Sequence, residues 1–194
     1  MNKSNLRYFA LPLALIALLI LLDIFCLNPP PLLPAGKIPS FRARSLQGQI
    51  YDEKIFDGHL TLVCLWVAGD NASAKFLADL SAWQQEEDSS LQLVGLVGDI
   101  KDDAPAARIS QARELTQNLP PSFPQLLVND SLAPFLTAIK TAPTCLFVDA
   151  EGQVTGQPVA GFELELIKKE ARRLSSADPF QDKMKNYLQS QLLR

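Results

Sequence analysis

The sequence predicts an α/β sandwich in which helices flank a mixed central sheet. Residues 60–67 and 91–98 are almost continuously apolar, as in strands that are covered on both faces. Segments with apolar residues at helical spacing lie between and after these two strands. The alternation of strand and helix, then a strand pair and a closing helix, is typical of this fold class.

The predicted elements follow one another from residue 41 onward. A β-hairpin over 41–47 and 50–56, with its turn at Gly48, forms an N-terminal extension to the sheet. Asp70 is placed to cap the helix that follows the strand at 60–67. The remaining elements are a helix over 105–118, a strand over 124–128, a helix over 131–139, strands over 144–149 and 153–159, and a helix over 162–174.

The composition is that of an ordinary globular protein and excludes several classes of function. Of the 194 residues, 47% are hydrophobic and 20% are charged, and the net charge is −3. Lys and Arg are scattered, so the chain has no basic patch for nucleic acid. It also has no glycine-rich phosphate-binding motif. We therefore expect one globular domain, no nucleic-acid partner and no cofactor.

A hydrophobic run at residues 8–27 predicts a transmembrane anchor. Its 20 residues carry a single charge, Asp23, and as a helix they would cover about 30 Å, the thickness of a bilayer core. The preceding segment, 1–7, contains Lys3 and Arg7. The positive-inside rule then places segment 1–7 in the cytoplasm. We expect a single-pass protein of the inner membrane whose domain faces the periplasm or extracytoplasmic side.

Two alternatives to an uncleaved anchor are less favoured. A cleaved signal peptide would need a small-x-small site, but the run is followed by Asn28-Pro29-Pro30-Pro31. Lipid attachment at Cys26 would need a small residue where Phe25 stands. The proline-rich segment 28–36 instead predicts a stiff linker between the membrane and the domain.

The C-terminal segment, residues 176–194, predicts an amphipathic helix. Its apolar residues recur every four positions: Phe180, Met184, Leu188 and Leu192. We expect this helix to pack back on the domain. The alternative is that it docks on a partner or on the membrane surface.

The cysteines and the histidine do not predict a metal site. Cys26, Cys64 and Cys145 are an odd number and have no Cys-x-x-Cys spacing, which argues against a disulfide framework and against zinc. The single histidine, His59, follows Gly58 in a predicted turn and is interpreted as an ordinary surface residue. We expect no bound metal.

Three short motifs in order resemble a known family. They are Ile38-Pro39-Ser40-Phe41 before the hairpin, Leu62-Val63-Cys64-Leu65-Trp66 in the central strand, and Ala142-Pro143-Thr144 before a Phe-Val-Asp strand. This series is similar to the membrane-anchored thioredoxin-like proteins of the TlpA/ResA and DsbE/CcmG kind. The resemblance implies a thioredoxin-like sandwich over 37–175, with Pro143 in the cis form. It also implies a setting in envelope thiol homeostasis or cytochrome c maturation.

The family's catalytic motif is absent from this chain. The resemblance implies Trp-x-x-x-Cys-x-x-Cys, in which the first cysteine is a nucleophile at a helix N-terminus. Trp66 is present, but the four positions that should hold Cys-x-x-Cys read Asp70-Asn71-Ala72-Ser73. Asp70 and Ser73 cannot exchange a disulfide, whereas a carboxylate suits a helix start. The active site is therefore interpreted as degenerate, and no catalytic residue is expected.

These observations favour a non-catalytic binding module over two alternatives. By resemblance, a protein or peptide partner would bind in a groove beside Pro143 that is formed by Trp66, Gly69, Asp70, Asn71, Ala142, Pro143 and Thr144. The first alternative is an active thiol–disulfide oxidoreductase that uses Cys64 or Cys145, although both lie in apolar runs and adjacent central strands seldom favour disulfide geometry. The second is a scaffold that contacts its partner through the 178–194 helix. Nothing in the sequence indicates an oligomeric state.

Overall fold

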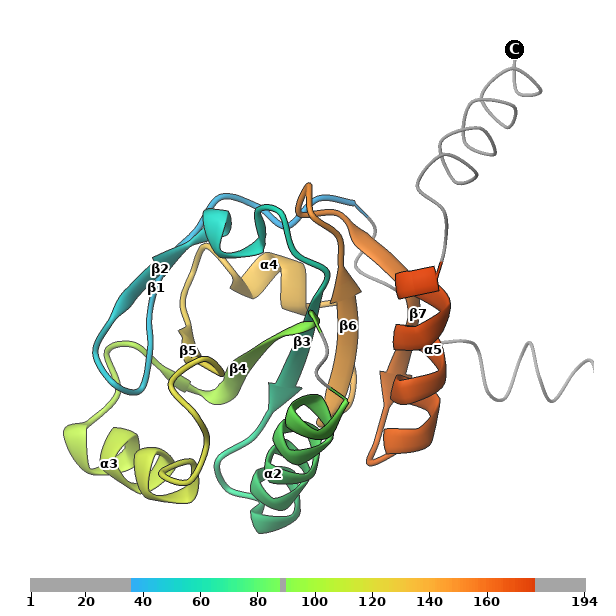
Figure 1. Cartoon of the computed structure of the whole chain (residues 1–194). Helices are drawn as coiled ribbons and strands as arrows, with labels where there is room; N and C mark the ends of the chain where they lie inside the picture. Colours follow the sequence, from blue (N-terminus) through green and yellow to red (C-terminus); the bar gives the residue numbers. More distant parts are fainter. Residues whose placement is uncertain (1–35, 88–89, 177–194) are drawn as a thin grey trace, which may run out of the picture. The chain divides into compact units, whose positions relative to one another are not determined.

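A computed structural model of the chain describes residues 36–87 and 90–176 (Figure 1). A five-stranded sheet with the order β5-β4-β3-β6-β7 lies at its centre. Strand β3 is parallel to β4, β4 is parallel to β5, and β6 is antiparallel to both β3 and β7. The strands are β3 (Thr61–Trp66), β4 (Gln92–Lys101), β5 (Gln125–Val128), β6 (Thr144–Val148) and β7 (Val154–Ala160). The predicted α/β architecture with a mixed sheet is confirmed.

Helices and a hairpin cover the two faces of this sheet. One hydrophobic core lies under helices α2, α3 and α5, which contribute Leu77, Ala112 and Ile167 to it. The other core lies under the hairpin and a short 3-10 helix, which contribute Ala43 and Phe56. The covering elements are β1 (Arg42–Arg44), β2 (Ile50–Asp52), the 3-10 helix η2 (Glu53–Phe56), α2 (Asn71–Glu86), α3 (Ala106–Leu115), α4 (Ala133–Leu136) and α5 (Leu164–Ser176).

Several elements are shorter or longer than the sequence predicts, because local hydrogen bonds set their ends. Strand β2 stops at Asp52, whose carboxylate accepts the Lys54 N–H at 3.1 Å and starts the 3-10 turn. Helix α3 ends before residue 118, where the Thr116 hydroxyl donates to the Ala112 carbonyl at 3.1 Å. Helix α4 has only four residues, and β4 continues past the predicted end at residue 98.

Strand β3 is covered on both faces, as its apolar run predicts. Cys64 and Trp66 point to the core under α2, whereas Val63 points to the core under the hairpin. The predicted apolar face of α2 packs on this strand, and its four predicted residues, Phe76, Leu77, Leu80 and Trp83, are all buried.

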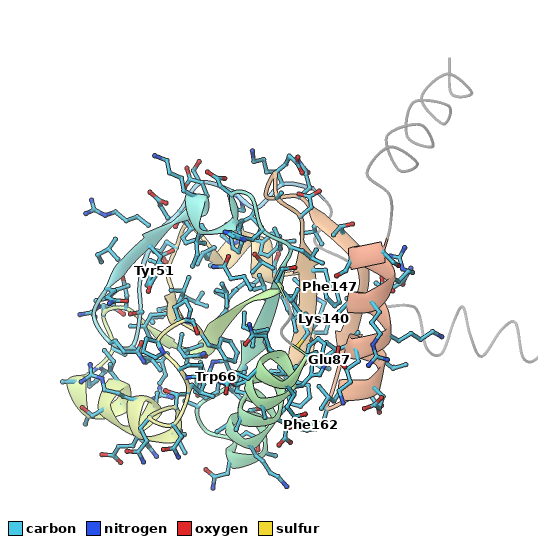
Figure 2. The ribbon with its side chains drawn as sticks, in the orientation of Figure 1. Tyr51, Trp66, Glu87, Lys140, Phe147 and Phe162 are labelled. Atoms are coloured by element: carbon cyan, nitrogen blue, oxygen red, sulfur yellow. The ribbon has the colours of Figure 1, made fainter. Side chains whose placement is uncertain are left out.

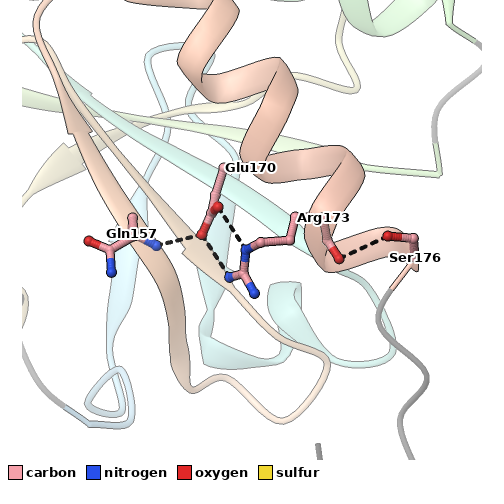
Figure 3. A network of polar contacts seen from close by, with 4 residues as sticks. All are labelled: Gln157, Glu170, Arg173 and Ser176. Carbon is pink, nitrogen blue, oxygen red and sulfur yellow. Dashed lines mark hydrogen bonds and ion pairs between the residues drawn. The ribbon is translucent and has the colours of Figure 1, made fainter. Parts of the chain in front are cut away.

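A hydrogen bond to Glu170, which is itself ion-paired with Arg173 within helix α5, joins the edge strand β7 to that helix (Figure 3). The Glu170 carboxylate accepts the Gln157 N–H at 2.7 Å, where the register between β6 and β7 is irregular. Arg173 donates to the same carboxylate at 2.8 and 2.9 Å, and the Ser176 hydroxyl donates to the Arg173 carbonyl at 3.1 Å. The Arg173 guanidinium and the Gln157 amide hold the pKa of Glu170 below its ordinary value. The irregular part of β7 is therefore held by a charged group on the covering helix.

Several predicted segments lie outside the described residues. These are the cytoplasmic N-terminus 1–7, the anchor 8–27, nearly all of the linker 28–36 and the C-terminal helix beyond Ser176. Within the described ranges, no helix combines the length and the apolar character needed to span a bilayer. His59 lies within them and is exposed, as expected.

Replacing Gly156 with alanine should destabilise the domain through the Glu170 ion pair. Gly156 has a φ of +69°, and a Cβ there would lie 2.6 Å from the Glu170 carboxylate. Gly58→Ala is the matched control, because Gly58 has a φ of +79° and open space around the added Cβ. We expect about 1 kcal/mol of backbone strain in the control and about 2–3 kcal/mol for Gly156→Ala, measured by urea unfolding. Equal losses would show that the contact with Glu170 is unimportant.

Candidate functional site

Three segments meet at one end of the sheet (Figure 1). They are the loop 67–70 after β3, the loop 141–143 before β6, and the turn after β7. Because β6 is antiparallel to both neighbours, its first residue, Thr144, pairs with Leu65 near the end of β3 and with Ala160 at the end of β7. The sheet topology alone therefore brings the predicted site segments together.

Two hydrogen bonds hold the loop before β6, one to the turn after β7 and one within the loop itself. The Ala142–Pro143 peptide bond is cis, as the resemblance implies. The Gly161 N–H donates to the Pro143 carbonyl at 2.8 Å, and the Thr144 hydroxyl donates to the Thr141 carbonyl at 2.7 Å. Pro143 and Thr144 are buried, so the exposed part of this loop consists of Thr141 and Ala142.

Asp70 caps helix α2, as its position predicts. One carboxylate oxygen accepts the Ala72 N–H at 3.0 Å. The other accepts the Ser73 N–H at 3.1 Å and the Ser73 hydroxyl at 2.8 Å. The Ser73 hydroxyl, followed by the Ala72 amide, holds the pKa of Asp70 below its ordinary value. A charged carboxylate thus occupies the donors at the start of α2, where the resembling family has its nucleophile.

A second carboxylate, which sequence reasoning missed, holds the loop before α2. Asp99 of β4 accepts the Ala68 N–H at 2.8 Å and the Gly69 N–H at 3.2 Å. The Arg108 guanidinium lies 3.4 Å from the same carboxylate. The strand register could have identified Asp99. Trp66 pairs with Val97 in parallel strands, so two residues further along each strand Ala68 lies beside Asp99. An acid at a strand end has no motif of its own, so only the register identifies it.

Phe162 is a second residue that sequence reasoning missed. Its side chain is 51% exposed and lies beside helix α2 (Figure 2). The ring packs edge-on against the ring of Phe76, with centroids 5.6 Å apart and an interplanar angle of 89°. Because the Gly161 N–H is hydrogen-bonded to the Pro143 carbonyl, Phe162 lies at the same end of the sheet as the Pro143 loop.

The predicted groove residues divide into a surface set and a buried set. Gly69, Asn71 and Ala142 are exposed and Asp70 is half-buried. Trp66 is fully buried, in the core beneath α2. The buried residues Trp66, Pro143 and Thr144 therefore lie beneath the exposed residues of the site. The groove itself stays a prediction.

No family model and no curated protein sequence matches this chain. Solved structures do match it, over 69% to 73% of its length in three examples. It is similar to a putative thiol:disulfide interchange protein DsbE from Chlorobium tepidum, at 19% identity and a TM-score of 0.52 over 72% of this chain and 96% of that one. It is also similar to the exposed lipoprotein thioredoxin Etrx1 of Streptococcus pneumoniae, at 17% identity and a TM-score of 0.52 over 69% and 98%. BsSco, of the Sco family of cytochrome c oxidase assembly proteins, matches at 12% identity and a TM-score of 0.57 over 73% and 95%.

This chain has a thioredoxin-like fold. The predicted thioredoxin-like sandwich with an N-terminal hairpin is therefore confirmed, and the order of the short motifs correctly indicated it.

The two thiols of the thioredoxin-like domain lie in its core. Cys64 of β3 and Cys145 of β6 are direct partners in the antiparallel register, and both are free cysteines. Their side chains are at most 1% exposed. Burial, and then the hydrogen bond and proximity to Cys64, raise the pKa of the Cys145 thiol. The sheet therefore keeps Cys145 uncharged and presents neither thiol at the surface.

Removing the Asp99 carboxylate should loosen the loop before α2. Asp99→Ala leaves the Ala68 and Gly69 N–H groups without their acceptor, which should cost about 1–2 kcal/mol. Hydrogen exchange at these two amides should become faster by at least tenfold relative to the wild-type chain. Asp103→Ala, at an exposed acid of the following turn, is the control and should leave both amides protected. Unchanged exchange in Asp99→Ala would mean that the loop is held by other contacts.

Proposed function

We propose that this protein is a membrane-tethered, extracytoplasmic thioredoxin-like module that binds a protein or peptide partner without exchanging disulfides. The observation that carries this proposal is the position of Asp70. Its carboxylate takes the two backbone N–H groups and the hydroxyl at the start of α2. In an active relative these helix-end donors would stabilise a thiolate.

The burial of the remaining thiols also supports a non-catalytic role. Thiol–disulfide exchange needs a thiolate that reaches the disulfide of a substrate. Cys64 and Cys145 lie inside the sheet with at most 1% exposure, and Ser73 is fully buried. This burial disfavours an oxidoreductase that uses Cys64 or Cys145 directly.

The surface around Pro143 has the features needed to bind an extended peptide. Thr141 and Ala142 are exposed and lie close to the end of β3, because Thr144 pairs with Leu65. Phe162 offers an exposed aromatic face at the same end of the sheet. A backbone edge gives affinity for an extended chain and an adjacent apolar group selects a side chain. The partner would lie across these residues, near Gly69 and Asn71.

Two further features support the cellular setting. The hydrophobic run at 8–27 and its basic flank support a tether with the domain outside the cytoplasm. The similar structures include an exposed lipoprotein, a DsbE protein and a cytochrome c oxidase assembly protein. We infer a role in envelope thiol homeostasis or cytochrome c maturation.

Restoring two cysteines at the start of α2 should create the activity that the natural chain lacks. Asp70→Cys combined with Ser73→Cys places a thiol at the helix N-terminus and a second one three residues later, in place of the Asp70–Ser73 hydrogen bond. We expect this double variant to accelerate insulin reduction by dithiothreitol at least tenfold. The wild-type chain should match the rate without protein.

The control is Asp70→Cys alone, which lacks the resolving thiol and should give mixed disulfides without turnover. Wild-type activity above the background rate would contradict the non-catalytic proposal. If that activity disappeared in Cys64→Ser or Cys145→Ser, the oxidoreductase alternative would replace the non-catalytic proposal.

Site-specific photocrosslinking should locate the partner surface. A benzophenone side chain at position 162 should give covalent adducts in cells that express the full chain. Position 50 is the matched control, because Ile50 is 52% exposed and belongs to the hairpin. We expect discrete adducts from position 162 and at least fivefold fewer from position 50. Adducts of equal yield at both positions, or none at 162, would contradict binding at this end of the sheet.

A further inference from the structure

The only two cysteines of the described ranges stand opposite each other in the sheet. Cys64 and Cys145 are 81 residues apart in the chain and are direct partners between β3 and β6. Direct partners in antiparallel strands point to the same face, and both residues belong to the core beneath α2. Cys64 contributes to raising the pKa of the Cys145 thiol, after burial, as expected for two neighbouring thiols.

We propose that Cys64 and Cys145 form a reversible cross-strand disulfide that joins the two strands carrying the candidate site. This inference is separate from the proposed binding function, which needs no thiol. It assigns the pair a structural role that depends on the redox conditions, and no part in turnover.

Adjacent central strands seldom favour disulfide geometry, but the direct register of Cys64 and Cys145 brings these two residues close to the separation that a disulfide requires. Direct partners in antiparallel strands have Cα atoms about 4.5–5.5 Å apart, and disulfides span about 4.4–6.8 Å. The Cβ atoms of such partners are about 4.5–5.5 Å apart, whereas disulfides bring them to about 3.5–4.5 Å. A small approach of the two strands is therefore sufficient, with no change of register.

The neighbouring pairs show that packing alone does not require sulfur at this position. On the two sides of the cysteine pair, the ladder joins Val63 to Leu146 and Leu65 to Thr144. The next pair on the same face is Leu62 with Phe147. Each of these pairs thus contains at least one larger apolar side chain, Leu or Phe. Two small thiols in direct register depart from this pattern, and a disulfide would join them into a single apolar group.

The oxidation balances with a low-molecular-weight disulfide as the oxidant. The Cys64 thiolate attacks one sulfur of the oxidant, forms a mixed disulfide and releases the first thiol. Cys145 loses its proton and attacks the Cys64 sulfur, which releases the second thiol. The protein loses two electrons and two protons, and the oxidant becomes two thiols. Because both thiols are buried, the reaction starts during a transient opening of the strands that exposes Cys64 to the oxidant.

The bridge would lie in the sheet beneath the candidate site and would connect the two strands that lead to it. Cys64 lies two residues before Trp66, which leads into the loop held by Asp99. Cys145 lies two residues after Pro143. A covalent link between them would fix the distance between the start of α2 and the Pro143 loop. Oxidising compartments, where disulfides persist, are the setting in which this link would form.

The test uses the full chain with Cys26→Ser, so that only the two sheet thiols remain. The folded protein is equilibrated with graded ratios of oxidised to reduced glutathione, quenched in acid, alkylated and analysed by mass spectrometry. We expect both thiols to disappear together with a loss of two hydrogen masses. A non-reduced digest should contain one linked pair of peptides carrying Cys64 and Cys145.

Variants and unfolding measurements separate the possible outcomes. Cys64→Ser and Cys145→Ser should each abolish the linked peptide, and the oxidised chain should unfold roughly 10 °C higher than the reduced one. Thiols that stay free at the most oxidising ratio would overturn the proposal. It would also be overturned by glutathione adducts without a link, or by disulfides between two chains. The insulin assay tests only the proposed non-catalytic binding function. Its outcome therefore does not decide whether the Cys64–Cys145 disulfide forms.

Discussion

Strand β3 is paired on both edges and covered on both faces, and the positions of Asp70, Asp99 and Pro143 follow from this constraint. Its parallel partner β4 brings Asp99 to the loop that β3 leads into. Its antiparallel partner β6 begins beside the end of β3, so Pro143 lies at the same end of the sheet as the loop that leads to α2. Because β3 is almost entirely buried, it has little freedom to shift its register. The site is therefore as rigid as the sheet that carries it.

Two carboxylates then determine what this rigid site can do. Asp70 satisfies the first N–H groups of α2, and Asp99 satisfies two N–H groups of the loop before it. These donors form a positive surface that would otherwise stabilise an external or thiolate anion. With both sets occupied by the protein's own charges, the helix end is neutralised. The exposed groups at this end of the sheet include Asn71, Ala142 and the ring of Phe162, and the proposed peptide binding rests on them.

Most of the fold could be predicted from the sequence, because buried strands and helix caps are local patterns. The run at 60–67, the cap at Asp70 and the apolar face of α2 all have short-range causes, and all three were confirmed. Asp99 and Phe162 could not be found in the same way. Asp99 acts on residues about 30 positions away through strand register, and Phe162 reaches the site only because Gly161 bonds to Pro143. Neither arrangement leaves a repeat or a motif.

In this fold, the solvent exposure of a cysteine thiol decides whether the thiol can be catalytic or only structural. A catalytic thiol needs a helix end to lower its pKa and a surface position to meet its substrate. Here the helix end holds Asp70, and the sulfur atoms lie inside the sheet at Cys64 and Cys145, where burial keeps the latter uncharged. This burial disfavours exchange with the disulfide of a protein partner, whereas the proposed bridge would join β3 to β6. The redox chemistry left to this chain would therefore act on the stability of the site and leave the partner's bonds unchanged.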